Sequence, residues 1–261
     1  MPTLHVVIPF YNEVSTLQRC IDRVVTAPLP QGWAAAIVLV DDHSDDHGRS
    51  CTESVARQLL AQGRRVSLHR HEVNRGKGAA VATGFDALLD SNPPGDDLVI
   101  IQDADLEYDP ADYRRLMGPM LDGETDAVIG SRWGDHHPVA GAKHKLHAWG
   151  NRAITALSNC MTGYRLRDME CCYKLLTVRM VKRVRPLLSE PRFGIEPQIV
   201  ASLARLGAKV TEVPVSYDPR RIDEGKKIGW TDGVRALYVI TRERFRRVPP
   251  GAHQHTEPGG E

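Results

Sequence analysis

Long apolar stretches are absent from this 261-residue sequence. The longest run, AAAIVLV at residues 34–40, is far shorter than the roughly 20 residues that a membrane-spanning helix needs. The first residues, MPTLHVVIPFYNE, contain neither the basic segment nor the cleavage site of a secretory leader. We therefore expect a cytoplasmic protein.

The chain also contains few cysteines and has a net charge close to zero. Five cysteines, an odd number without any CxxC pair, predict neither a disulfide framework nor a zinc knot. A formal net charge of +1 gives no reason to expect a nucleic-acid partner. The hydrophobic content of 41% and the charged content of 26% are typical of a soluble globular protein.

The first half of the chain alternates short apolar runs with longer helical patterns. We expect strands at residues 4–9, 36–41, 66–70, 98–103 and 126–130, and helices near 13–26, 48–61, 78–90 and 110–121. This βαβα order predicts an α/β fold with a mostly parallel central sheet and helices on both faces. Ligands of such sheets bind at the carboxyl ends of the strands.

The pattern changes after residue 134. Residues 135–147 are rich in His, Lys, Gly and Pro and predict a loop that is poorly ordered without ligand. Beyond it we expect a helix near 144–162, strands near 171–176 and 209–215, and helices near 195–206 and 229–246. We expect one domain over residues 1–247, with halves 1–134 and 135–247, followed by a disordered Gly/Pro-rich tail at 248–261.

Three carboxylates follow the expected strand at residues 98–103. Asp103 and Asp105 are two residues apart and would leave a continuing strand on the same side, and Glu107 continues the spacing. Such oxygen ligands suit Mg²⁺ or Mn²⁺, which proteins hold with carboxylates and substrate phosphates. A solvated acidic turn that caps the helix after Pro110 is the alternative. Because the acids directly follow a buried strand at the binding edge, we favour the metal site.

Basic residues near the same edge would accompany a metal-bound diphosphate. NRGKGAA, residues 74–80, places Arg75 and Lys77 in a Gly-rich turn that opens a helix, where backbone N–H groups can face an anion. The turn matches neither a P-loop nor a dinucleotide fingerprint. Its alternative explanation is that the glycines allow close packing. Arg132, in GSR, follows the next strand.

Polar residues end the first two expected strands, in IPFYNE and VDDHSDD. Pro9 lacks a backbone donor and is expected to turn the chain outward. Asp41 or Asp42 can accept hydrogen bonds from the imino and amino groups of a base. Taken singly, Asn12, and Ser44 or Asp46, are equally typical of helix N-caps.

Together these stretches give a resemblance to a known family. The sequence resembles the family 2 glycosyltransferases of the GT-A fold, and more narrowly the group of dolichyl-phosphate mannose synthases and polyprenyl-phosphate glycosyltransferases. The matching stretches run in order from residue 6 to about 240: VVIPFYNE, VLVDDHSDD, NRGKGAA, QDADLEYDP, GSR, RDMECCYK, RFGIEPQI and EGKKIGW. The sequence departs from the family at His43, where Gly is usual, and shows no C-terminal transmembrane helices like those of many relatives.

The resemblance implies an inverting, metal-dependent transfer of a hexose from UDP-hexose or GDP-hexose to a polyprenyl or dolichyl phosphate. It implies that the nucleotide sugar is bound by Pro9, Tyr11, Glu13, Asp41, Asp42, Lys77, Asp103, Ala104, Asp105 and Arg132. The implied ligands of Mg²⁺ or Mn²⁺ are Asp103, Asp105 and Glu107, and the implied acceptor-side catalytic residue is Asp168. Arg220, Lys226 and Lys227 match the group that binds the acceptor phosphate.

Phosphate and hydroxyl acceptors make different demands on the site. A phosphate monoester has a second pKa of about 6, so at neutral pH it needs cations more than a base. DPRRIDEGKK, residues 218–227, offers four such cations. A soluble glycosyltransferase acting on a sugar or small-molecule hydroxyl is the alternative, and it would need a carboxylate base. A non-catalytic nucleotide-sugar-binding protein is disfavoured because the DxD motif and Asp168 are both present.

A lipid acceptor requires contact with a membrane surface. The helices expected near 144–162 and 229–246 carry apolar stripes and neighbouring basic residues. They are expected either to lie peripherally in the interface on the cytoplasmic face of a membrane or to pack against the sheet as core helices.

Overall fold

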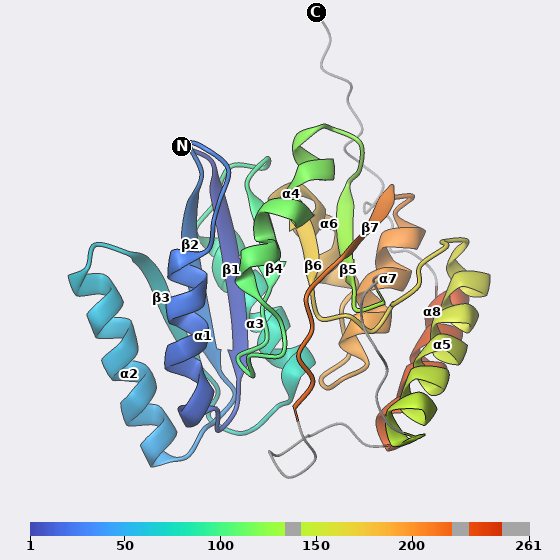
Figure 1. The fold of residues 1–261 in the computed structure, drawn as a ribbon, viewed down its shortest axis with the longest axis horizontal. Helices are drawn as coiled ribbons and strands as arrows, with labels where there is room; N and C mark the ends of the chain where they lie inside the picture. The colour runs from blue at the N-terminus through green and yellow to red at the C-terminus, as the bar shows by residue number, and fades with distance from the viewer. Residues whose placement is uncertain (134–141, 221–229, 247–261) are drawn as a thin grey trace, which may run out of the picture.

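A computed structural model describes residues 1–133, 142–220 and 230–246 of the chain. Its centre is a sheet with the strand order β3-β2-β1-β4-β6-β5-β7 (Figure 1). The strands are β1 (Thr3–Phe10), β2 (Ala34–Asp41), β3 (Arg65–Arg70), β4 (Leu98–Ile101), β5 (Ala127–Ser131), β6 (Lys174–Thr177) and β7 (Val210–Pro214). Strand β6 is antiparallel to both its neighbours, β4 and β5, and the other paired strands are parallel. The predicted mostly parallel sheet is confirmed.

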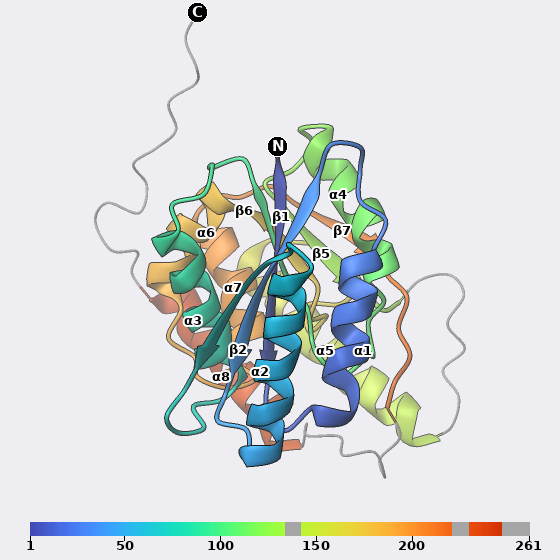
Figure 2. The same cartoon turned by 90° about the vertical axis from the view of Figure 1, so that its left-hand side faces the viewer.

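Helices cover both faces of this sheet. They are α1 (Val14–Thr26), α2 (Asp46–Ala61), α3 (Lys77–Asp90), α4 (Tyr113–Leu121), α5 (Ala142–Thr162), α6 (Val178–Val184), α7 (Ile195–Arg205) and α8 (Trp230–Phe245), with 3₁₀ turns at Pro110–Asp112 and Arg185–Leu187. Figure 2 shows α1 and α4 on one side of the sheet and α3 and α6 on the other. None of the helices in the described part of the chain is long and apolar enough to cross a bilayer.

The central strands are apolar on both faces, which explains why they need helices on both sides. Every residue of β1 and of β4 is buried. Helix α1 meets them with a stripe at helical spacing, Leu17, Cys20, Ile21 and Val24, all of which are buried. The parallel register pairs Phe10 with Asp41, so the segments that follow β1 and β2 emerge together at the carboxyl edge of the sheet.

Strand β1 continues through Pro9, so the expected outward turn at this residue is wrong. The carbonyl of Val7 accepts from the backbone N–H of Gln102 at 2.9 Å, and β4 pairs with β1 only as far as Val7 and Ile101. Pro9, two residues further on, faces the same side as Val7 beyond the end of β4. Its missing N–H therefore breaks no ladder hydrogen bond, which is the condition under which a strand tolerates proline.

Two other boundaries differ from the sequence expectations. Strand β4 ends at Ile101 because the next side chain, Gln102, turns inward and its Oε1 accepts from the hydroxyls of Tyr113 at 2.6 Å and Tyr173 at 2.8 Å. Asp103 and Asp105 therefore lie on a turn and not on a continuing strand. Of the loop expected at residues 135–147, residues 142–147 belong to α5. Residues 135–141 lie outside the described part of the chain.

The Gly-rich turn before α3 packs tightly against residues 190–192. Gly76 has φ of +93°, and a Cβ on it would lie 2.5 Å from the carbonyl oxygen of Pro191. A Cβ on Gly78, inside α3, would clash with the carbonyl oxygen of Glu190. The glycines therefore allow close packing, as the alternative explanation of NRGKGAA proposed.

We predict that Gly78→Ala destabilises the fold by about 1–3 kcal/mol, because the added methyl group has no space beside the Glu190 carbonyl. Gly150, in α5, is the matched control, since it is exposed and a Cβ on it would meet nothing within 4 Å. Gly150→Ala should be neutral or stabilising by up to about 1 kcal/mol. Urea unfolding of the three proteins measures both effects. Equal stability of Gly78→Ala and wild type would contradict the packing described.

Candidate functional site

One lysine connects two other elements to the turn after β4, which carries Asp103, Asp105 and Glu107 and is called the acidic turn below. Lys77, the first residue of α3, places its Nζ 2.8 Å from Asp103 Oδ1 and 2.7 Å from Oε1 of Glu196, in the first turn of α7. The three side chains are 8–20% exposed. Lys77 was predicted to lie at the donor phosphates, and the structure places its ammonium between two carboxylates at that edge of the sheet.

The other two carboxylates of the turn have different surroundings. Asp105 Oδ1 accepts from the backbone N–H of Glu107 at 3.1 Å. Glu107 accepts from the Tyr217 hydroxyl at 2.9 Å and from the backbone N–H of Arg220 at 3.0 Å. Burial, together with the negative charges of Asp103 and Glu107, raises the pKa of Asp105 to about 7.

This concentration of negative charge fits a divalent cation. Oxygen ligands from one or two carboxylates are what Mg²⁺ and Mn²⁺ take, with the rest supplied by water and phosphate. Asp103 and Asp105 suit that role by position, but both oxygens of Asp103 lie within 2.9 Å of Lys77 Nζ, so a cation would share this carboxylate with Lys77. Both oxygens of Glu107 accept hydrogen bonds from Tyr217 and Arg220. Within the described ranges no three His, Cys, Asp or Glu side chains form a group that could hold a metal ion by themselves.

The carboxylate of Asp42 is engaged in hydrogen bonds within the protein. Its carboxylate accepts from His71 Nδ1 at 2.7 Å and from the backbone N–H groups of Arg75 at 2.8 Å and Gly76 at 2.7 Å. The N–H groups that the sequence analysis assigned to an anion therefore bind Asp42. Its neighbour Asp41 accepts from the Ser44 N–H at 2.7 Å.

The segments after β1 and β2 hold each other in place. The backbone N–H of Asn12 donates to Ser44 Oγ at 2.9 Å, and Asn12 Oδ1 accepts from the N–H of Asp45 at 2.9 Å. None of the three candidate caps is an N-cap, since Glu13 is the N-cap of α1, Asp45 is the N-cap of α2, and Asp46 is the first residue of α2. His43 has φ of +69°, a left-handed conformation that favours glycine, which is the residue that the resemblance leads one to expect at this position. Tyr11 lies beside these residues and is 38% exposed.

Asp168 forms an ion pair with Arg132, whose side chain is 19% exposed. Arg132 Nε and Nη2 donate to the two Asp168 oxygens at 2.7 Å each, and the Arg132 backbone N–H donates at 3.0 Å. Asn151, on α5, adds a fourth bond at 2.9 Å. The Arg132 guanidinium also lies 5.3 Å from the ring centroid of Tyr217. Asp168 is fully buried.

This geometry fits a positioning role for Asp168 better than proton abstraction. Although burial raises the pKa of a carboxyl, the charge and hydrogen bonds of Arg132 outweigh burial and hold the pKa of Asp168 below its usual range. All four bonds to its oxygens are made inside the protein, so the carboxylate has no free oxygen pointing to an acceptor. It fixes the guanidinium of Arg132, which was predicted to face phosphate.

Arg220 lies at the rim of the acidic turn, next to residues that were predicted to bind the nucleotide sugar. Its Nη2 donates to Glu13 Oε2 at 2.8 Å, and its Nε donates to the carbonyl of Asp105 at 2.8 Å. Arg220 thereby joins the end of β1 to the acidic turn. Lys226 and Lys227, its predicted companions, lie outside the described residues. Ala104, between the two aspartates, is buried.

Glu196 was missed as a site residue by the sequence analysis. The only signal was its position in RFGIEPQI, which contributed to the resemblance as a whole but assigned no role to Glu196. Its contact with Lys77 crosses 119 positions of sequence, and no local spacing predicts such a pair.

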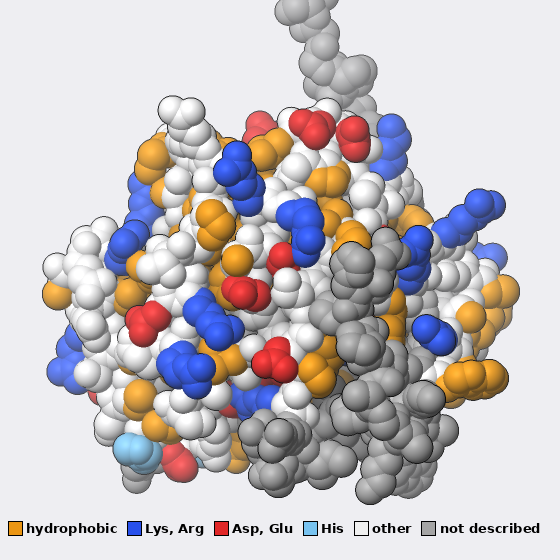
Figure 3. Space-filling model, viewed as in Figure 1, with side chains coloured by type: hydrophobic (Ala, Val, Ile, Leu, Met, Phe, Trp, Pro, Cys, Tyr) orange, Lys and Arg blue, Asp and Glu red, His pale blue; other side chains and the backbone are white. Residues whose placement is uncertain are grey.

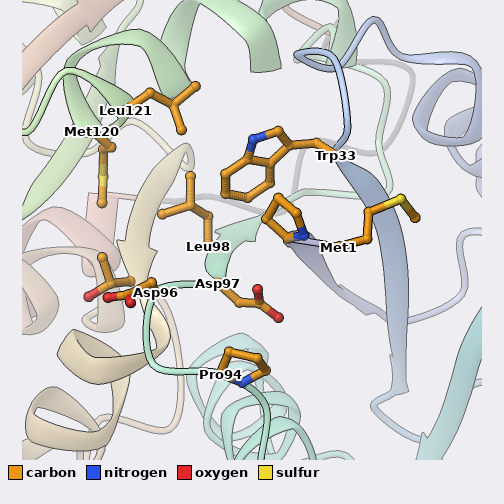
Figure 4. Close-up of a pocket in the computed structure, with 10 residues that line it drawn as sticks. Met1, Trp33, Pro94, Asp96, Asp97, Leu98, Met120 and Leu121 are labelled. Atoms are coloured by element: carbon orange, nitrogen blue, oxygen red, sulfur yellow. The ribbon is translucent and has the colours of Figure 1, made fainter.

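The hollow drawn in Figure 4 lies away from these residues. It is lined by Met1, Trp33, Asp97, Leu98 and Met120 among others, so it opens at the amino ends of β1 and β4. Ligands of parallel sheets bind at the opposite edge, where the acidic turn lies.

The family model for "Glycosyl transferase family 2" matches residues 5–185. The chain belongs to this family. It is a glycosyltransferase. The matched segment contains the acidic turn, Lys77, Arg132 and Asp168.

Curated relatives of this glycosyltransferase include transferases of polyprenyl phosphates. The undecaprenyl-phosphate mannosyltransferase of Micrococcus luteus is 27% identical over 90% of this chain and 91% of its own. The dolichyl-phosphate beta-glucosyltransferase ALG5A of Trichomonas vaginalis is 26% identical over 82% of this chain and 65% of its own. Glycosyltransferase AglJ of Haloferax volcanii is 28% identical over 95% of this chain and 74% of its own. The predicted family and group are confirmed.

Solved structures with the same fold include glucosyl-3-phosphoglycerate synthase of Mycobacterium tuberculosis. Its complex with Mn²⁺, UDP and phosphoglyceric acid has a TM-score of 0.65 and 20% identity, over 95% of this chain and 80% of that chain. At this identity the likeness shows the GT-A fold of the present glycosyltransferase and nothing about its substrates.

We predict that Asp168→Asn lowers the stability of the glycosyltransferase by about 3 kcal/mol at pH 7, since it leaves Arg132 buried without its counter-charge. The folded-state pKa of Asp168 is lowered, so its stabilising contribution is present above the unfolded pKa of about 3.9 and is lost as the pH falls through the folded value. The difference between wild type and variant should therefore shrink below about pH 4. Chemical denaturation from pH 7 to pH 3 measures it.

The exposed Asp90 is the control, and Asp90→Asn should show a small difference at every pH. A stability difference for Asp168→Asn that stays constant down to pH 3 would mean that the carboxylate is not the group that pairs with Arg132.

Proposed function

We propose that this enzyme moves a hexose, with inversion, from UDP-hexose or GDP-hexose to a polyprenyl phosphate, and that it uses Mg²⁺ or Mn²⁺. The observation that carries the proposal is the acidic turn at the carboxyl edge of the sheet. There Asp103 and Asp105 lie between the cations Lys77 and Arg220, and the pKa of Asp105 is raised by burial and by its acidic neighbours.

The donor side of the proposal rests on residues at the ends of β1, β2, β4 and β5. Asp103 and Asp105 would hold the metal, which when bound neutralises charge on the departing nucleoside diphosphate. Pro9, Tyr11, Glu13 and Asp41 lie at the ends of β1 and β2, where a nucleotide would bind, and Asp42 orders the turn before Lys77. Arg132 is held in one orientation by Asp168, which suits it to meet phosphate oxygens without reorganisation.

A polyprenyl phosphate acceptor is supported by the acceptors of two relatives and by the basic residues at and after Arg220. Two relatives are described by their transfer to undecaprenyl phosphate and dolichyl phosphate. Arg220 lies at the rim of the acidic turn, and the chain continues directly from it into the segment that contains Lys226 and Lys227. We assign these three cations to the acceptor phosphate, which is dianionic at neutral pH and needs cations more than a base.

Helices α5 and α8 support peripheral membrane contact. Helix α8 has a buried inner side that includes Val239 and Ile240, and an outer side with exposed apolar residues. Among the residues of the two helices whose exposure is described, the most exposed apolar side chains are Phe245 at 78% and Trp149 at 72%. Figure 3 shows hydrophobic side chains on the α5–α8 end of the molecule. An exposed aromatic and basic helix surface is typical of helices that lie in a membrane interface.

Vesicle co-sedimentation tests this contact. We expect the wild type to sediment with vesicles that contain anionic lipid, and Trp149→Ser/Phe245→Ser to sediment several-fold less, because two exposed apolar anchors are lost. Leu60→Ser is the control, since Leu60 on α2 is also exposed, at 57%. Equal sedimentation of all three proteins would exclude α5 and α8 as the membrane-facing surface.

A transfer assay tests the function itself. Purified protein is incubated with Mn²⁺, a polyprenyl phosphate in vesicles, and UDP-glucose or GDP-mannose labelled in the sugar. We expect butanol-extractable label from at least one donor, because the product is a glycolipid. Label that appears only in water-soluble products of sugar or small-molecule acceptors would favour the soluble glycosyltransferase instead.

Asp103→Asn and Asp105→Asn are the controls for metal use in this assay. Each should abolish transfer, since loss of one carboxylate charge weakens a site that shares the cation with the donor diphosphate. Asp122→Asn, at an exposed position after α4, should leave transfer unchanged. Normal turnover by either site variant in excess EDTA would show that the acidic turn holds no metal.

A further inference from the structure

The chain segment that carries Asp168 has no helix or strand of its own. Residues 163–173 connect α5 to β6 without regular secondary structure. Asp168 is nevertheless fully buried, and each of its oxygens lies 2.7 Å from a guanidinium nitrogen of Arg132. Two parallel hydrogen bonds of this kind require accurate placement of both partners. Contacts from outside the segment must therefore fix its backbone.

Side chains of α5 and β7 accept hydrogen bonds from four consecutive N–H groups of this segment. The N–H groups of residues 166–169 donate in order to Asn159, to Glu212 Oε1, again to Glu212 Oε1, and to Thr155. The bonds to Glu212 measure 2.7 Å and 2.8 Å, and those to Asn159 and Thr155 measure 3.0 Å and 3.3 Å. A carboxylate also accepts more strongly than an amide or hydroxyl oxygen. Glu212 is therefore the main contact that holds the backbone N–H of Asp168.

The strand ladder fixes Glu212 relative to Arg132. Strand β7 is parallel to β5, and Glu212 pairs with Ile129, three positions before Arg132. The ladder thus places the backbone on both sides, Glu212 places the backbone of Asp168, and the Asp168 carboxylate places the guanidinium of Arg132. These contacts form a closed ring, in which Glu212 is the contact between β7 and the Asp168 segment.

This ring controls the orientation of Arg132. A guanidinium that meets phosphate with two parallel N–H groups depends on its angle as well as on its distance. In an enzyme site a misplacement of about 1 Å can cost about 100-fold in rate. A residue that fixes the pair of Asp168 and Arg132 from outside can therefore control transfer without any contact with the substrate.

We infer that Glu212 is a positioning residue for glycosyl transfer, which holds Asp168 where its carboxylate orients Arg132 toward phosphate. The inference rests on the proposed function, because it takes Arg132 to meet a phosphate of the substrates. It goes beyond that function by assigning a role to a strand residue that acts through two others. The effect of Glu212 on the rate should therefore depend on the guanidinium that it orients.

Amide hydrogen exchange, measured by NMR without any substrate, tests the contact itself. In Glu212→Met, which has a similar volume but no acceptor, the amides of Arg167 and Asp168 should exchange at least about tenfold faster than in the wild type. Glu212→Gln retains an acceptor oxygen and should exchange as the wild type does. Glu212→Asp, which keeps the charge but is one methylene group shorter, replaces Glu212→Met if the latter does not fold.

Transfer kinetics test the role of the contact. At a temperature where each variant is folded, Glu212→Met should lower kcat/KM at least about tenfold, and Glu212→Gln should stay within about threefold of the wild type. Asp126→Leu is the matched control, because Asp126 Oδ2 accepts from the backbone N–H of Lys209 at 2.7 Å, just before the same two strands begin. It removes a bond of the same kind at the opposite edge of the sheet and should leave transfer within about twofold.

A double-mutant cycle distinguishes positioning from a general structural role. Arg132→Lys keeps the positive charge beside Asp168 but loses the two parallel N–H groups. If Glu212 acts by orienting the guanidinium, Glu212→Met should change kcat/KM by less than about twofold in the Arg132→Lys background. A structural defect elsewhere would lower the rate by the same factor in both backgrounds.

Two results would overturn the inference while leaving the proposed function intact. One is a Glu212→Met variant that transfers hexose to polyprenyl phosphate as fast as the wild type does. The other is a full loss of rate on adding Glu212→Met to Arg132→Lys. If the wild type transfers only to water-soluble acceptors, the proposed function fails, and the same cycle on that reaction still decides the role of Glu212. A wild type without any transfer would remove both proposals.

Discussion

The position of Lys77 determines the geometry of the whole carboxyl edge. Its ammonium joins the turn after β4 to the first turn of α7, and its backbone begins α3. The three side chains are mostly withdrawn from water, so each charge depends on the other two. Removing one member of such a buried group leaves an uncompensated charge, at a cost of about 3–5 kcal/mol. The Gly-rich turn, the acidic turn and the 190–196 segment are therefore arranged around one side chain.

The antiparallel strand β6 explains why residues far apart in the sequence share this edge. It enters the sheet between β4 and β5, so the turn that leads into it runs alongside the carboxyl ends of those strands. That turn carries Asp168 and Glu170. The pair of Asp168 with Arg132 thus spans the end of β5 and the turn before β6.

The fold and most element positions were predictable because they follow from short-range patterns. Buried strands such as β1 and β4 are continuous apolar runs, and α1 has a clear stripe at helical spacing. The end of β4 was not predictable, since it depends on Gln102 accepting from Tyr113 and Tyr173, which lie 11 and 71 positions away. The tolerance of β1 for Pro9 likewise depends on where its neighbour β4 ends.

The types of residue at the site were predictable, but their partners were not. Pattern and resemblance identified Lys77, Asp42 and Arg220 as charged residues at the binding edge. The structure adds that Lys77 binds Asp103 and Glu196, that Asp42 binds backbone N–H groups of the Gly-rich turn, and that Arg220 binds Glu13. Each of these contacts joins segments that are separated by at least 26 positions in the chain, and only the completed fold brings them together.

The negative charge that remains unbalanced at the carboxyl edge of the sheet indicates which kind of ligand binds there. Cations and N–H groups satisfy Asp42, Asp168 and one oxygen of Glu196, whereas burial and the charges of Asp103 and Glu107 raise the pKa of Asp105 to about 7 even with Arg220 nearby. Folding alone would not favour this arrangement, because apolar or paired side chains would be more stable in the same places. A divalent cation at the acidic turn would relieve the repulsion between Asp105 and its acidic neighbours, so part of the free energy of metal binding would come from removing that repulsion.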